Sequence, residues 1–249
     1  MDSLEIKIFE REEELQDFAS DHILSTIAET ITIRNKCFVS LSGGTTPRKI
    51  YERIAKKAME QNVDWKSVHF FWGDERCVPP DDERSNYLMA KKALLSTIDL
   101  PSENIHRIKG EINPEDSAYD YEAEMKRSFS TEITPSFDIM LLGLGDDTHT
   151  ASLFPSSPAL KETQRWAVPV LNEHGESRIT LTLPVINHAT TTIFIVSGKN
   201  KAEAVYRVLL NRFDPDKYPA QSVKPESGNL FWLLDSAAAS LYLRNKDKG

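Results

Sequence analysis

The feature of the sequence that most constrains the fold is an apolar run at residues 139–144 that ends abruptly in glycines, acids and a histidine. The run has no polar alternation, which is typical of a parallel strand that is covered on both faces. In open α/β sheets, ligands bind beyond the carboxyl ends of such strands. We therefore expect Asp146, Asp147 and His149 where reactive groups lie. The alternative is a helix N-terminus capped by Asp146 or Asp147, with His149 an incidental surface residue.

Strand and helix patterns alternate along almost the whole chain. Strands are predicted at residues 5–9, 37–41, 68–72, 139–144, 167–171, 179–183 and 192–197, and a last apolar segment lies at 230–234. Helices are predicted at residues 12–32, 47–61, 86–95, 115–130 and 201–210, and an irregular loop at 211–227. This order predicts an α/β fold of three layers, in which a mostly parallel, Rossmann-like sheet has helices on both faces. We expect one domain over residues 1–249.

Composition excludes several classes of protein. Hydrophobic residues make up 40% and charged residues 27% of the chain, which is typical of an ordinary globular protein. A net charge of −8 argues against extensive nucleic-acid binding, which needs a basic surface. No window approaches the ~18 apolar residues of a membrane span, so no membrane association is expected and the predicted location is the cytoplasm. Cys37 and Cys77 are expected to be free thiols.

Two strand ends besides the one before His149 carry candidate ligands. At 42–47 a glycine turn enters a helix, so Gly43, Gly44, Thr45 and Thr46 are candidates for holding a phosphate, the alternative being a simple structural turn. At 73–76 Asp74 and Arg76 follow a strand, and Arg76 either meets an anion or developing oxyanion or forms a surface ion pair. Asn86 is a candidate for sugar hydroxyl contact or for helix capping.

Three basic residues around the later strands are candidate phosphate ligands: Arg178, Lys199 and Lys201. The alternative for the lysines is solvation near a helix start. The chain lacks the serine hydrolase elbow G-x-S-x-G, the zinc motif H-E-x-x-H, and any recurring histidine spacing for a metal. No metal or other cofactor is expected.

Taken together, five segments resemble the 6-phosphogluconolactonase family, which shares its fold with glucosamine-6-phosphate deaminases and, more distantly, ribose-5-phosphate isomerases. The resemblance spans most of the chain and rests on residues 41–47, 72–79, 85–87, 143–155 and 178–184. The family places its catalytic histidine in the pattern G-x-D-G-H-T-A-S-L-F-P, where this chain has His149. Thr148 stands in place of the glycine before it. If that position has positive φ, a β-branched residue there is strained.

The resemblance implies hydrolysis of 6-phospho-D-glucono-1,5-lactone to 6-phospho-D-gluconate, the second step of the oxidative pentose phosphate pathway. His149, oriented by Asp147, would activate water, and Arg76 would stabilise the oxyanion or hold the substrate. Amino-sugar deamination is less favoured, because residues 150–161 hold no carboxylate, whereas the resembling deaminases have a glutamate there. A non-catalytic sugar-phosphate sensor is the second alternative. The expected partner is a small sugar phosphate, and the chain is expected to be a monomer or weak homo-oligomer.

Overall fold

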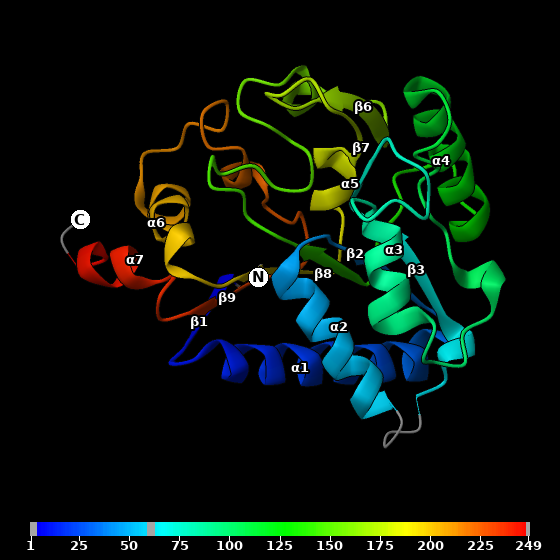
Figure 1. Cartoon of the computed structure of the whole chain (residues 1–249), viewed down its shortest axis with the longest axis horizontal. Coiled ribbons are helices and arrows are strands. Elements are labelled where there is room, and N and C mark those ends of the chain that lie inside the picture. The colour runs from blue at the N-terminus through cyan, green and yellow to red at the C-terminus, as the bar shows by residue number, and fades with distance from the viewer. Residues whose placement is uncertain (1–3, 59–62, 248–249) are drawn as a thin grey trace.

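Six parallel strands form the central sheet within residues 4–58 and 63–247, the parts of the chain that the computed structural model describes (Figure 1). Their spatial order is β1-β9-β8-β5-β2-β3, and every neighbouring pair is parallel. The strands are β1 (Leu4–Phe9), β2 (Cys37–Leu41), β3 (Val68–Trp72), β5 (Ile139–Leu142), β8 (Thr191–Val196) and β9 (Asn229–Asp235). All four residues of β5 and all six of β8 are buried, as expected for central strands covered on both faces.

Helices cover both faces of this sheet. Figure 1 shows α1 and α2 on its lower side and α4 and α6 on its upper side. The helices are α1 (Glu12–Arg34), α2 (Thr45–Ala58), α3 (Asn86–Ala90), α4 (Pro114–Phe129), α5 (Leu183–Asn187), α6 (Ala202–Leu210) and α7 (Ser240–Asn245). The predicted three-layer α/β architecture is confirmed. The helix predicted over 47–61 corresponds to α2, and its last three positions, 59–61, lie outside the described residues.

A second, antiparallel sheet lies above the main one. It has the order β4-β7-β6, with β4 (Asp74–Arg76), β7 (Ser177–Leu181) and β6 (Ala167–Leu171). Strands near 167–171 and 179–183 were predicted, but β4 was not, because three charged residues carry no strand pattern. The Cα partners Arg76 and Arg178 face each other across β4 and β7. This small sheet therefore brings Arg76, which follows β3, beside Arg178, which comes about a hundred residues later in the chain.

The order of the strands fixes where a ligand crevice forms. The chain passes from β2 outward to β3, and then returns to the other side of β2 to add β5, β8 and β9. β2 and β5 are therefore neighbours whose connections run in opposite directions. Such a switch point is where open α/β sheets bind ligands, beyond the carboxyl ends of the strands.

Candidate active site

A cavity of about 290 Å³ lies at this switch point. Its walls come from the turns that follow β2, β3 and β5, and from the small sheet and the start of α6. Its lining includes Ser42, Gly43, Gly44, Asp74, Arg76, Asn86, Gly145, His149, Arg178 and Lys201. The fold thus brings together eight of the candidate residues named from the sequence, from segments far apart in the chain.

His149 is held by Asp147 in the loop after β5. The Nδ1 atom of His149 lies 2.5 Å from Oδ1 of Asp147, and the same oxygen accepts the His149 backbone N–H at 3.1 Å. Burial raises the pKa of Asp147, but the hydrogen bonds and charge of His149 outweigh it, so the pKa lies below its ordinary value. The carboxylate therefore stays ionised and fixes the proton on Nδ1. Nε2 has no hydrogen-bond partner among the described residues and is free to meet water or substrate.

The backbone of this loop is strained at Thr148. Its φ is 74°, in the left-handed region that a β-branched residue rarely adopts, and the side chain is fully buried. The loop is a turn closed by a hydrogen bond from Thr148 N–H to Gly145 O at 3.0 Å. A Cβ on Gly145 would lie 2.1 Å from His149 Nδ1, so only glycine lets the imidazole fold back over the turn. The alternative of a helix N-terminus at this loop is wrong.

Two guanidinium groups face the cavity without complete hydrogen bonding. Arg76 donates from Nη1 to the backbone oxygen of Arg84, and Arg178 donates from Nη2 to Glu176 at 2.8 Å. The Nε atoms of both arginines are buried and have no partner among the described residues. Because buried donors normally find a partner, these two point to an anionic or oxygen-rich ligand.

A buried polar network fixes the wall of the cavity that carries Asp74 and Asn86. Ser152 Oγ donates to Asp74 Oδ2 at 2.6 Å, and the amide of Asn86 donates to Asp74 Oδ1 at 3.2 Å and to its backbone oxygen at 2.9 Å. A Cβ on Gly43 would lie 1.9 Å from the Asn86 side-chain oxygen, so this glycine is required for close approach. The capping role weighed for Asn86 belongs instead to Ser85, whose hydroxyl accepts the N–H of Leu88 at 3.1 Å.

The basic candidates near α6 occupy different places. Lys201 lines the cavity and its Nζ lies 2.5 Å from Oδ1 of Asp146, whereas Lys199 is exposed and lines no part of it.

The two candidate threonines at the start of α2 do not line the cavity. Thr45 is exposed, and the Thr46 hydroxyl lies 2.8 Å from that of Ser197. Because α2 begins at Thr45, its first turn carries these side chains away, and its N-terminal backbone N–H groups are what remain near the cavity.

Three residues around the site were not among the predicted ones. The Ser42 hydroxyl lines the cavity, buried and without a partner among the described residues. Ser152 orients Asp74, as described above, and the Phe154 ring lies against the imidazole of His149, with 4.8 Å between ring centroids. Ser42 and the Ser152–Phe154 segment belong to the same motifs as the predicted residues. Which side chains of a motif point into a cavity depends on strand ends that sequence patterns place only approximately.

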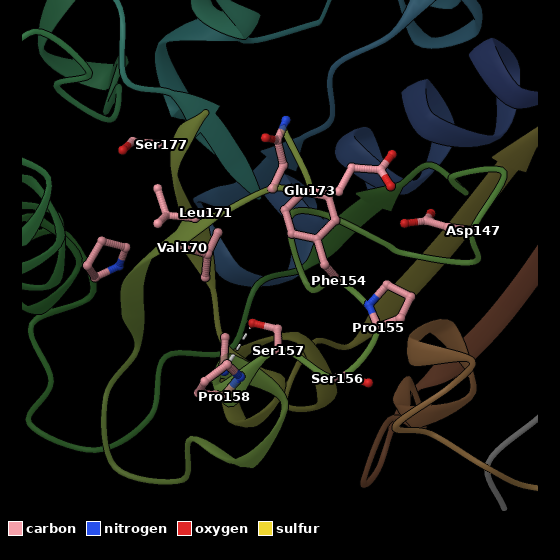
Figure 2. A pocket seen from close by; sticks show the side chains of 13 residues that line it. Asp147, Phe154, Pro155, Ser156, Ser157, Pro158, Val170, Leu171, Glu173 and Ser177 are labelled. Carbon is pink, nitrogen blue, oxygen red and sulfur yellow. Dashed lines mark hydrogen bonds between the residues drawn. The ribbon is translucent and has the colours of Figure 1, made fainter. Parts of the chain in front are cut away.

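A larger groove of about 690 Å³ lies alongside the site, and Figure 2 shows its lining residues. It runs between the 154–159 segment and β6, with Asp147 at its edge. Its described lining contains the carboxylates of Asp147 and Glu173 but no Lys or Arg. The smaller cavity is therefore the one equipped to hold an anion beside His149.

Two features of the described residues bear on the kind of protein. The described part of the chain contains no group of three or more His, Cys, Asp or Glu side chains placed to hold a metal ion. None of the helices in that part combines the length and apolar character needed to cross a bilayer.

Known proteins resemble this chain in both sequence and fold. Residues 10–232 match the family model of glucosamine-6-phosphate isomerases/6-phosphogluconolactonase. A 6-phosphogluconolactonase of Synechocystis is 42% identical over 219 residues, which is 87% of this chain and 89% of that protein. The structure of the 6-phosphogluconolactonase from Trypanosoma brucei matches with a TM-score of 0.83 and 26% identity, over 96% of this chain and 99% of that one. A monomeric glucosamine-6-phosphate deaminase matches in fold alone, with a TM-score of 0.81 at 22% identity over 95% and 99% of the two chains.

Proposed function

This chain belongs to the glucosamine-6-phosphate isomerase/6-phosphogluconolactonase family, and we propose that it hydrolyses 6-phospho-D-glucono-1,5-lactone to 6-phospho-D-gluconate. The observation that carries the proposal is the His149–Asp147 pair at the carboxyl end of β5, which faces a cavity that also holds two arginines and a lysine. A general base beside a set of cations suits water attack on the carbonyl of a phosphorylated lactone.

The residues around His149 favour lactone hydrolysis over amino-sugar deamination. Isomerisation and loss of ammonia need proton transfers at more than one carbon, and therefore a second acid or base close to the first. From Thr150 to Lys161 the chain has no carboxylate, and the buried Asp74 is already bonded to Ser152 and Asn86. The Synechocystis relative, at 42% identity, is a lactonase, whereas the deaminase likeness extends to fold alone.

In the first step, Nε2 of His149 takes a proton from a water molecule as the water oxygen attacks the lactone carbonyl. Asp147 accepts the hydrogen bond from Nδ1, which selects the tautomer with a lone pair on Nε2 and stabilises the imidazolium that forms. The carbonyl oxygen becomes an oxyanion. Arg76, whose Nε has no partner within the described part of the chain, is assigned to stabilise it.

In the second step, the tetrahedral intermediate collapses and the bond between the carbonyl carbon and the ring oxygen breaks. The imidazolium of His149 returns its proton to the ring oxygen, which leaves as a hydroxyl group. The new carboxylic acid then ionises, so each turnover releases one proton to solvent. These steps use no cofactor.

The phosphate is assigned to the basic side of the cavity. Arg178 and Lys201 both line it, and the N-terminal N–H groups of α2 after Gly43 and Gly44 add donors at the positive end of a helix. Asp74 and Asn86, which line the same cavity, are assigned to contact sugar hydroxyls. The cytoplasmic location and the monomeric or weakly associating state expected from the sequence stay predictions.

The reaction is tested by supplying freshly made 6-phosphogluconolactone and, separately, glucosamine 6-phosphate to the purified protein. We expect 6-phosphogluconate to form faster than in the enzyme-free blank, and no ammonia to form from the amino sugar. Ammonia release would identify a deaminase. Tight binding of 6-phosphogluconate without turnover of either compound would identify a sensor.

A further inference from the structure

The carboxylate of Asp146 is placed to act on the phosphate that Lys201 is proposed to hold. Oδ1 of Asp146 lies 2.5 Å from the Nζ of Lys201 and 3.4 Å from the side-chain nitrogen of Asn200. The Lys201 side chain is 25% exposed, whereas that of Asp146 is 66% exposed. The ammonium group therefore meets the carboxylate on its solvent side and the cavity on its inner side.

Asp146 is close to the site without being part of the cavity wall. It lines an outer hollow of about 410 Å³ that shares Gly145, His149, Arg178 and Lys201 with the inner cavity. A phosphate held by Arg178 and Lys201 lies next to this hollow, because both residues line it as well as the inner cavity. An exposed ion pair is weak, so a phosphate can displace Asp146 from Lys201. Because the carboxylate stays close, it reduces the binding free energy of that phosphate.

The charges of substrate and product make this effect unequal. The lactone carries only its phosphate, with about −1.5 to −2 charges at pH 7. The hydrolysed product carries the same phosphate and one carboxylate more. The product therefore depends more than the substrate on the cations of the site, and loses more binding free energy when Asp146 neutralises Lys201.

We propose that Asp146 lowers the affinity of the site for phosphorylated ligands, and most of all for the product, by competing for Lys201. The inference rests on the proposed lactonase function. It assigns a role to a side chain that touches neither His149 nor the reacting carbonyl.

The test compares Asp146→Asn with the wild type in calorimetric binding of 6-phosphogluconate and of inorganic phosphate, and in the KM for the lactone. We expect Asp146→Asn to bind 6-phosphogluconate about three- to tenfold more tightly, with a smaller gain for phosphate and a lowered KM. Glu173→Gln is the matched control, because Glu173 lines the same outer hollow and bears the same charge but does not contact Lys201. An equal gain in both variants, or none in either, would overturn the proposal.

The Lys201→Met background identifies the route of the effect. There, Asp146→Asn should change the affinity less than twofold; an undiminished effect would exclude competition for Lys201.

If the wild type binds 6-phosphogluconate without hydrolysing the lactone, the proposed function fails while the Asp146 comparison still stands. If it hydrolyses the lactone and Asp146→Asn binds product as the wild type does, only the inference fails. Binding of neither ligand by any variant overturns it as well.

Discussion

At the scale of single residues, Thr148 separates Asp147 from His149 and holds a conformation that suits glycine. Its carbonyl accepts the N–H of Ala220 at 3.1 Å, so the strained residue is tied to the segment before β9. The left-handed region costs a non-glycine residue about 1–2 kcal/mol. That strain persists because the surrounding structure fixes the turn that presents the imidazole.

A pair of variants at Thr148 measures this strain. Thr148→Gly and Thr148→Ala both remove the buried hydroxyl and methyl groups, but only glycine accepts φ of 74° without cost. We expect Thr148→Gly to have a free energy of unfolding about 1 kcal/mol higher than Thr148→Ala, measured by urea denaturation. The opposite order is the one expected at negative φ and would show that the turn is not strained.

At the scale of elements, the buried carboxylate of Glu75 joins β4 to α3. It accepts hydrogen bonds from the backbone N–H groups of Arg76, Asn86 and Tyr87, each at 2.8 Å, and from the Ser85 hydroxyl at 2.9 Å. One side chain thus fixes the segment that carries Arg76 and the helix start that carries Asn86. The geometry of that wall of the cavity depends on a group that does not line it.

Replacing Glu75 by glutamine should therefore damage both stability and the site. An amide nitrogen would face N–H donors, leaving at least one buried donor unsatisfied at a cost of about 1–3 kcal/mol. We expect Glu75→Gln to lower the free energy of unfolding by that amount and to lower kcat/KM. Glu83→Gln, in the exposed loop nearby, is the control and should change neither. Equal behaviour of the two variants would mean that Glu75 is dispensable.

The main elements were predictable because their signals are local. The strands and most helices follow from apolar runs and helical periodicity, and the predicted 139–144 strand became β5 with its loop beginning at Gly143. The small sheet was not predictable, because β4 is Asp-Glu-Arg and exists only through its pairing with β7. The sequence predicted that Arg76 and Arg178 both lie near the site. It could not predict that they lie side by side, because that arrangement depends on the pairing of β4 with β7.

At the scale of the whole molecule, a pair of neighbouring histidines lies at the β3 edge of the main sheet. Nδ1 of His69 lies 2.9 Å from Nε2 of His106, whose Nδ1 lies 2.7 Å from Glu124. Burial, the neighbouring His106 and the charge of Lys36 lower the pKa of His69 to about 4, and burial lowers that of His106 despite Glu124. Both imidazoles are thus held neutral in the folded protein near neutral pH.

This pair predicts a loss of stability in acid. Between pH ~6.5 and about 4 the unfolded chain protonates His69 while the folded protein does not, so the free energy of unfolding falls as the pH falls. After allowance for solvent screening, His69 lowers the free energy of unfolding by about 1 kcal/mol across this pH range. Urea denaturation across this range should show a shallower decline for His69→Phe than for the wild type. The exposed His174→Gln is the control, and a parallel decline in all three proteins would contradict the assignment.

One histidine, which β5 brings to the switch point of the sheet, is proposed to perform the hydrolysis. The most direct measurement is proton release from fresh 6-phosphogluconolactone by wild type, His149→Ala and His174→Ala, after subtraction of spontaneous hydrolysis. His174 lines the outer hollow beside the site and serves as the matched control. We expect a wild-type rate for His174→Ala and a loss of about 10²–10⁴-fold for His149→Ala. A wild-type rate in His149→Ala would contradict this proposal.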